Sequence, residues 1–119
     1  MKTVNFLFAF FLTFCIADAQ DQHQYLTERP YAVILGIAQD GGYPHAGCER
    51  LCCKDAWKSD SLRKMVSSIA IIDPRSGLAW MFDATPDFAK QYNIITKQHG
   101  ARLAGIFLTH AHIGHYTGL

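Results

Sequence analysis

The chain has 119 residues, which limits it to one domain or less. Half of its residues are hydrophobic, an ordinary fraction for a globular protein. The formal net charge of +1 gives no support for a nucleic-acid-binding surface or an acidic tail. The sequence contains no internal repeat and no low-complexity run. Composition therefore gives no evidence for a nucleic-acid partner and is silent about the oligomeric state.

Residues 1–19 have the pattern of a secretory signal peptide. Lys2 precedes an apolar stretch over residues 4–16, and Ala17-Asp18-Ala19 provides an A-x-A cleavage site. An uncleaved anchor or a buried helix is the alternative, but the stretch is short for a membrane span. Cys15 follows a bulky residue, which disfavours a lipid anchor. We therefore predict export to the periplasm or the exterior after cleavage near Ala19, without a stable membrane anchor, leaving residues 20–119 as the mature part of this chain.

Residues 31–37 form a nearly continuous apolar run, as expected for a strand buried on both faces. The following residues, 38–47, contain three glycines and a proline, which predict an irregular turn. Asp40 and His45 lie in this loop and could border a site. Polar loop residues of this kind are more often simply solvated.

Three cysteines follow the loop with the spacing C-x3-C-C: Cys48, Cys52 and Cys53. The spacing permits a structural metal with a fourth ligand such as His45. It also permits one disulfide, since an exported protein meets an oxidising compartment. Free, partly buried thiols are the third alternative. Adjacent cysteines pair poorly with each other, and an odd number leaves at least one thiol unpaired.

The remaining elements alternate strands with helices up to a histidine-rich end. Asp83 closes the second strand of a hairpin, and Pro86 suits the first turn of the following helix. Asp83 or Thr85 could cap that helix. The predicted elements are a helical segment at 49–64, a hairpin at 67–73 and 78–83, a helix at 86–98 and a strand at 101–108.

Three histidines lie within six positions directly after the last strand: His110, His112 and His115. Residues two apart in an extended segment point the same way, so His110 and His112 can present their imidazoles to one point. His115 lies in a segment that can turn back toward them. Neutral imidazole is a favoured ligand of zinc, so this spacing predicts a metal site.

The stretch Leu-Thr-His-Ala-His-Ile-Gly-His-Tyr-Thr-Gly-Leu resembles the metal loop of the metallo-β-lactamase fold, whose usual form is HxHxDH followed by Gly-Leu. This resemblance implies that His110 and His112 serve one metal and that His115 serves a second. Gly114 stands where the family pattern carries Asp. The resemblance thus implies zinc, with one ion or two, and a second ion that is weakened, relocated or absent.

The glycine loop and the cysteines resemble the N-terminus of the pyrroloquinoline quinone biosynthesis B family, which shares this fold. In that family the cysteines are associated with structural zinc, although their spacing there is C-x-C-x-x-C. The fold resemblance also implies that Asp83 lies beneath the metal loop and orients a histidine, since metal-bound imidazoles commonly donate their other N–H to a carboxylate.

These observations lead to one expectation for the fold and two for the function. We expect an α/β chain forming the N-terminal half of a four-layer αββα sandwich, that is, a fragment of a larger domain. The parent protein is expected to be a zinc-dependent hydrolase acting on an ester, lactam, phosphodiester or cofactor precursor. The alternative is a non-catalytic exported metal-binding module, or a fragment inactive by itself.

Overall fold

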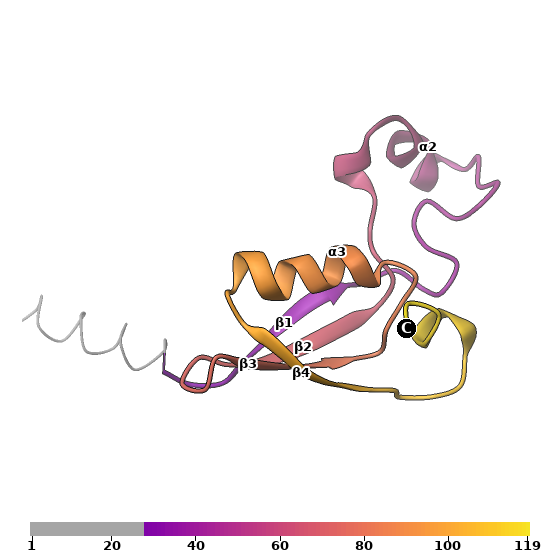
Figure 1. Ribbon diagram of the computed structural model, residues 1–119. Helices are drawn as coiled ribbons and strands as arrows, with labels where there is room; N and C mark the ends of the chain where they lie inside the picture. Colours follow the sequence, from indigo (N-terminus) through magenta and orange to yellow (C-terminus); the bar gives the residue numbers. More distant parts are fainter. Residues whose placement is uncertain (1–27) are drawn as a thin grey trace, which may run out of the picture.

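The computed structural model describes residues 28–119 (Figure 1). The predicted signal peptide at 1–19 lies outside the described residues and stays a prediction. Among residues 28–119, no helix combines the length and the apolar character that crossing a membrane requires.

A four-stranded mixed sheet in the order β1-β2-β3-β4 forms the centre of the described chain. Its strands are β1 (Tyr31–Gly36), β2 (Ser68–Asp73), β3 (Leu78–Phe82) and β4 (Arg102–Phe107). The first three strands are antiparallel neighbours, whereas β4 lies parallel to β3. Because β3 and β4 are parallel, the segments that follow them leave the sheet at the same end of these strands.

The predicted hairpin between β2 and β3 is confirmed, and Asp73 holds its turn. The Asp73 carboxylate accepts hydrogen bonds from the Arg75 N–H at 3.0 Å and from the Ser76 hydroxyl at 2.8 Å. Such side-chain acceptance of turn donors is the reason that Asp is frequent at these positions. The register that follows places Ile72 opposite Ala79, so both strands direct small and branched residues to the same face.

The helix predicted at 86–98 is confirmed as α3 (Phe88–Asn93), continued by the π-helical segment η2 (Ile94–Gln98). It lies over one face of the sheet (Figure 1). Ile95 is fully buried there against Leu35 and Met81, which form the core with neighbouring apolar residues. The helical segment ends at Gln98, and Gly100, two residues further on, has a φ of +65°, the left-handed conformation common after a helix terminus. This packing connects β3 to β4 across the covered face.

The helical segment predicted at 49–64 is a short helix, α2 (Leu51–Lys58), followed by the 3-10 turn η1 (Asp60–Leu62). This unit stands off the sheet at the end of two connecting segments (Figure 1). The connecting segments are tied together by the bridges of Ala38 to Val66 and of Tyr43 to Lys64. The glycine loop is thereby fixed to the segment that leads into β2.

A buried polar network joins the start of α3 to the segment before β2. Gln91 is fully buried. Its amide N–H donates to the Val66 carbonyl at 2.8 Å, and its carbonyl accepts the Thr85 hydroxyl at 2.7 Å. Asp87 completes the link by accepting the Val66 N–H at 3.0 Å. Every partner in the network is thus satisfied.

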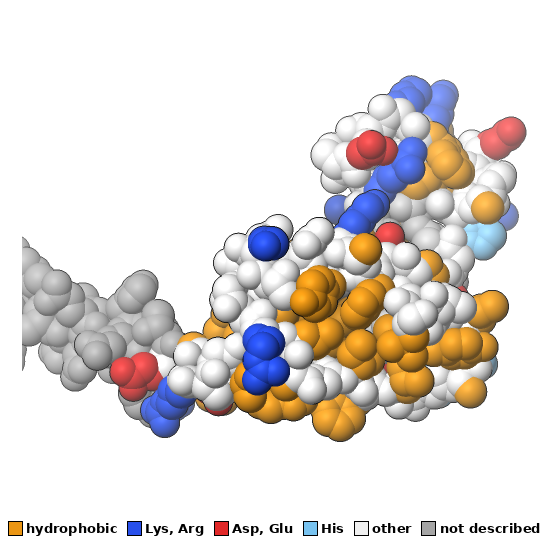
Figure 2. Space-filling model, in the orientation of Figure 1, with side chains coloured by type: hydrophobic (Ala, Val, Ile, Leu, Met, Phe, Trp, Pro, Cys, Tyr) orange, Lys and Arg blue, Asp and Glu red, His pale blue; other side chains and the backbone are white. Residues whose placement is uncertain are grey.

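The prediction that residues 31–37 are buried on both faces is wrong. Leu35 is 1% exposed, but its neighbour Ile34 is 70% exposed and Ile37 is 66% exposed. The strand β1 lies at the edge of the sheet, and among the described residues no element covers the face opposite α3. Ile69 lies on that same face, and hydrophobic side chains gather over the sheet below α3 (Figure 2). A continuous apolar run does not by itself show how many layers cover it.

The buried network predicts the cost of an apolar substitution at Gln91. Gln91→Leu leaves the Thr85 hydroxyl and the Val66 carbonyl without their partner, so we expect the free energy of unfolding to fall by about 1–3 kcal/mol. Gln98→Leu makes the same chemical change at an exposed position of the same helix and should stay within about 0.5 kcal/mol of the wild type. Chemical denaturation followed by circular dichroism measures both, and equal effects would contradict the assigned role of the network.

Candidate metal centre

The histidine cluster lies where β3 and β4 leave the sheet. Phe82 and Phe107 are register partners at the ends of these strands, and the Asp83 N–H donates to the Phe107 carbonyl at 2.8 Å. Residues 108–115 then fold back toward Asp83 and finish in the short turn η3 (Ile113–His115) (Figure 1). The parallel pairing therefore brings Asp83 and the histidines together.

Asp83 is the buried centre of this arrangement. It is 5% exposed and has a φ of +69°, a left-handed conformation that residues other than glycine rarely adopt. Its carboxylate accepts the Thr109 N–H at 2.8 Å and the Thr109 hydroxyl at 2.8 and 2.9 Å. It also accepts Nδ1–H of His115 at 2.7 Å. The Asp83 side chain therefore holds the histidine loop, and it does not cap α3.

These hydrogen bonds favour the charged forms of Asp83 and His115. Burial by itself raises the pKa of Asp83, but the bonds from Thr109 and His115 outweigh it, so the pKa of this carboxyl lies below its ordinary value of 3.8. The hydrogen bond to Asp83 raises the pKa of His115 above its ordinary value of 6.5, against the opposing effect of burial, and Asp40 adds to the rise. The hydrogen bond between His115 and Asp83 is therefore charge-assisted when both groups are ionised, and such a bond is stronger than a neutral one.

The same carboxylate selects the imidazole nitrogens that are left for a ligand. Nδ1 of His115 is occupied by Asp83, so Nε2 is its available nitrogen. The Thr109 hydroxyl gives its proton to Asp83 and can therefore accept Nδ1–H of His110, at 2.9 Å. Nε2 of His110 is left as a lone-pair donor. Asp83 thus orients one histidine directly and another through Thr109.

The three rings gather around His110. Its centroid lies 4.6 Å from that of His112 and 4.1 Å from that of His115. Nε2 of His110 is 3.0 Å from Nδ1 of His112. His110 and His112 are exposed, whereas the His115 side chain is only 13% exposed. The contacts form two linked pairs, His110 with His112 and His115 with the carboxylates.

Gly118 lets the histidine loop lie directly on the β3–α3 connection. A Cβ at this position would lie 2.2 Å from the Thr85 carbonyl oxygen and 2.5 Å from Cβ of Phe88. The Gly118 N–H donates to the Ala84 carbonyl at 2.9 Å, and the Ala84 N–H donates to the His115 carbonyl at the same distance. The Gly-Leu part of the sequence motif therefore closes the loop against α3.

Asp40 joins the site from the glycine loop after β1. Its Oδ1 lies 3.1 Å from Nε2 of His115. Sequence reasoning placed Asp40 only in a loop bordering a site. Nothing in the sequence shows that residues 75 positions apart meet here, because their approach depends on the bridge that ties the loop to the segment before β2.

The donor set fits a zinc-like ion. Zinc holds imidazole nitrogen and carboxylate oxygen at about 2.0–2.1 Å, which places two tetrahedral ligands about 3.3 Å apart. The separations of 3.0 Å for His110–His112 and 3.1 Å for His115–Asp40 are close to that value. Each of these two pairs therefore has about the spacing of two ligands on one divalent cation.

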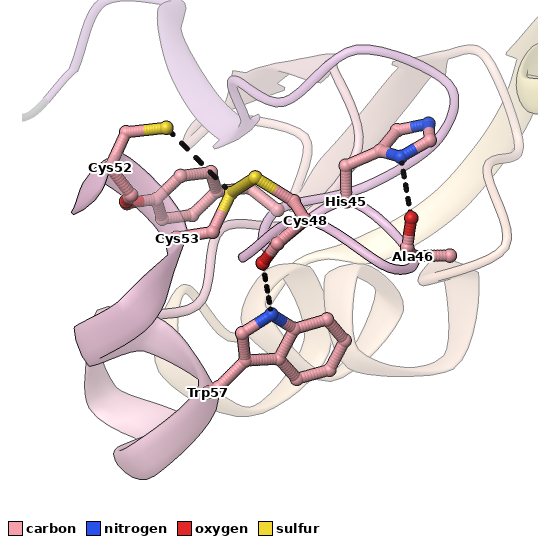
Figure 3. The surroundings of a disulfide bond; sticks show 7 residues. His45, Ala46, Cys48, Cys52, Cys53 and Trp57 are labelled. Atoms are coloured by element: carbon pink, nitrogen blue, oxygen red, sulfur yellow. Dashed lines mark hydrogen bonds between the residues drawn. A yellow bond between two sulfur atoms is a disulfide. The ribbon is translucent and has the colours of Figure 1, made fainter. Parts of the chain in front are cut away.

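The three cysteines form a second cluster on the α2 unit (Figure 3). One sulfur from each lies within 4.8 Å of the others, a spacing that can hold a metal. The structure contains the disulfide alternative: Cys48 and Cys53 are bonded, with a Cα–Cα distance of 6.0 Å, and Cys52 is a free, exposed thiol. Thiolates, and not disulfide sulfurs, ligate metals, so the pair is either oxidised or available to an ion.

His45 does not complete this cluster. Its ring points away from the sulfur atoms (Figure 3), and Nδ1 lies 3.0 Å from the Ala46 carbonyl oxygen. The cysteines instead line a pocket that includes Tyr43, whose hydroxyl donates to the Cys52 carbonyl. Trp57 donates from its indole N–H to the Cys48 carbonyl at 2.8 Å. His45 lines the same pocket, but in this arrangement only the three cysteines form a group of possible metal ligands there among the described residues.

Comparison with solved structures identifies the fold class. The chain is similar to the zinc-bound PqqB of Methylobacterium extorquens, with a TM-score of 0.62, 29% identity, and coverage of 76% of this chain and 32% of that one. It is also similar to a diphosphatase from the PhnP family, with a TM-score of 0.58, 26% identity, and coverage of 76% and 33%. Both are metallo-β-lactamase fold proteins, and the chain belongs to that superfamily.

Within the superfamily, the sequence is similar to coenzyme PQQ synthesis protein B of Pseudomonas putida (strain W619). The identity is 34% over 99 residues, which cover 75% of this chain and 32% of that protein. The chain thus spans about one third of the length of the relatives that it matches. No protein-family model matches it.

The Asp83–His115 pair predicts a pH dependence of stability in the metal-free protein. Because the pKa of His115 is raised, its contribution is complete below 6.5 and is lost as the pH rises through the folded pKa. Because the pKa of Asp83 is lowered, its contribution is complete above 3.8 and is lost as the pH falls through the folded pKa. We expect the stability difference between wild type and Asp83→Asn, about 1–3 kcal/mol, to be largest between these two values.

Chemical denaturation across the pH range measures this difference, and NMR titration of the imidazole protons reports the pKa of His115, which should fall in Asp83→Asn. Asp60→Asn is the matched control, since the Asp60 side chain is 90% exposed and remote from the site. A His115 pKa that is the same in both variants would contradict the assigned contact.

Proposed function

We propose that the protein containing this chain is a metal-dependent hydrolase that uses zinc at the histidine cluster to cleave a small-molecule substrate. The observation that carries the proposal is the packing of the His110 ring against the rings of His112 and His115, with a buried carboxylate orienting two of the three. The names of the structural relatives, a zinc-bound PqqB and a diphosphatase, support it.

In this proposal, the exposed histidines bind the ion, and the groups behind the rings orient them. His110 and His112 are exposed at the sheet edge, so their nitrogens can hold an ion that a substrate also reaches. Asp83 and Thr109 accept the Nδ1–H of His115 and His110 and so orient the Nε2 of each ring, which is the usual role of groups behind metal-bound imidazoles. A zinc ion held by these residues would supply Lewis acidity, which would polarise the bond under attack and lower the pKa of bound water to about 7.

The proposed substrate is a small molecule with an ester, lactam or phosphoester bond. The diphosphatase name of one relative supports a phosphoester, and the similarity to PQQ synthesis protein B supports a cofactor precursor. Fold similarity alone does not determine the substrate. A panel of chromogenic carboxylic esters, phosphodiesters and lactams is therefore the appropriate first assay.

His112→Ala should lower kcat/KM for the responding substrate by roughly 100-fold, because an ion that loses an imidazole ligand is bound and positioned poorly. Chelation should remove the activity of the wild type, and zinc should restore it. His99→Ala is the control, since His99 is exposed and contacts Tyr31, away from the cluster. Full activity of His112→Ala in a folded full-length protein would refute the proposal.

A non-catalytic metal-binding module is the second candidate, and Gly114 favours it. Glycine at this position supplies no ligand, so the histidine loop by itself offers fewer donors than the family pattern. A metal-loaded full-length protein that stays inert across the substrate panel would establish this function in place of hydrolysis.

We also propose that the cysteines hold a structural zinc when they are reduced. The three cysteine sulfur atoms lie within 4.8 Å of one another, which supports this. The reduced protein should bind one more zinc per chain than the oxidised protein, and Cys48→Ser should abolish that difference. Metal analysis after gel filtration, with and without reductant, makes the measurement. Equal zinc content in both states would exclude the cysteine site.

A further inference from the structure

The contact between Asp40 and His115 carries an inference beyond the histidine motif. Nδ1 of His115 is taken by Asp83, so Nε2 is the nitrogen that can serve a cation. Oδ1 of Asp40 lies 3.1 Å from that same Nε2. An imidazole nitrogen and a carboxylate oxygen therefore face each other at about the separation of two ligands on one zinc ion.

Gly114 explains how Asp40 reaches this position. A Cβ on Gly114 would lie 2.5 Å from Cγ, 2.6 Å from Cβ and 2.9 Å from Cα of Asp40. Rotating the Asp40 side chain cannot relieve an overlap that includes its Cα. The Gly114 backbone does not have a positive φ, so space and not conformation requires glycine here. Asp40 therefore fills the space that a side chain at position 114 would need.

The origin of Asp40 makes the approach a property of the fold. The Ala38 carbonyl accepts the Ser67 N–H at 2.8 Å, and Ala38 pairs with Val66. These bonds hold the start of the glycine loop, two residues before Asp40, to the segment leading into β2. The Asp40 side chain is 39% exposed, so a cation can reach it.

We propose that Asp40 is a metal-ligating carboxylate of the histidine site, and that it substitutes in space for a side chain at position 114. Asp40 and His115 then form the donor pair for one ion, beside His110 and His112. This inference rests on the proposed metal-dependent function. It assigns the missing ligand to a segment 74 residues earlier in the sequence than Gly114.

The test compares cobalt and zinc binding by full-length variants, with the Cys48–Cys53 disulfide kept oxidised so that sulfur does not compete. Asp40→Asn keeps the size of the side chain but removes its charge. Asp60→Asn is the control for charge. Gly114→Asp and the double variant Asp40→Gly with Gly114→Asp test whether a carboxylate can be moved from one segment to the other. Chelator competition and cobalt absorption spectra report affinity and ligand number, and thermal unfolding reports folding.

We expect Asp40→Asn to lower the affinity for one ion by at least about tenfold, a loss typical of altered metal-site partners. Asp60→Asn should bind metal as the wild type does. Gly114→Asp should lower the melting temperature because it collides with Asp40. The double variant removes Cβ and Cγ of Asp40 but keeps its Cα, 2.9 Å from the new Cβ, so it should recover part of the melting temperature. The moved carboxylate should restore most of the affinity.

Two results would overturn the inference, and they are distinguishable. In the first, the His110→Ala variant loses the metal while the Asp40→Asn variant binds every ion as the wild type does. The histidines then bind metal, and Asp40 is not a ligand. If the wild type holds no ion at the histidines, the proposed function and the ligand role fail together, although the collision between positions 40 and 114 would still appear in the melting temperatures.

Discussion

The arrangement of the histidines depends on the hydrogen bonds that the Asp83 carboxylate accepts. One buried side chain accepts two kinds of hydrogen bond from Thr109 and one from His115, and it does so from a left-handed backbone conformation. Strain of that kind persists only where the surroundings over-determine it, and it is concentrated at functional sites. Here the surroundings are the ends of two parallel strands, so the sheet topology and the site geometry have the same origin.

The direction of the proton donors is as important as their number. Because Thr109 gives its hydroxyl proton to Asp83, the same oxygen can accept from His110. In both His110 and His115, Nε2 is then the nitrogen that takes no part in these bonds. A single ionised carboxylate thus prepares two imidazoles for a cation. His112 depends on neither bond, and its contact is with the ring of His110.

The glycine loop connects the histidine site to the cysteine cluster. One end of it places Asp40 beside His115, and the other end leads to the cysteines and α2. The cysteine unit lies away from the sheet, held by Tyr43 and Trp57 through carbonyl contacts. A metal or a disulfide at the cysteines therefore stabilises a segment that a hydrophobic core of its own supports only weakly, since Cys53 and Ala56 are the buried residues of α2.

Much of this molecule could be predicted from local sequence. Helical and strand periodicity gave the hairpin, the helix before Gly100 and the final strand, because these depend on neighbouring residues. The HxHxxH spacing and the glycine-rich loop pointed to the metallo-β-lactamase fold, which the structural relatives confirm. The site roles of the histidines and of Asp83 stay predictions, although the structure brings these residues into contact.

Tertiary structure decided what depends on distant segments. The apolar run at 31–37 could not show that one of its faces lacks a covering layer among the described residues, since apolarity does not count layers. Nor could Gly114, which reads as a lost ligand in the sequence, show that its missing side chain makes room for Asp40. The sequence by itself determined the types of ligand and their local spacing. Only the folded chain, by pairing β3 with β4 and tying the glycine loop to the segment before β2, decided which carboxylates meet the imidazoles.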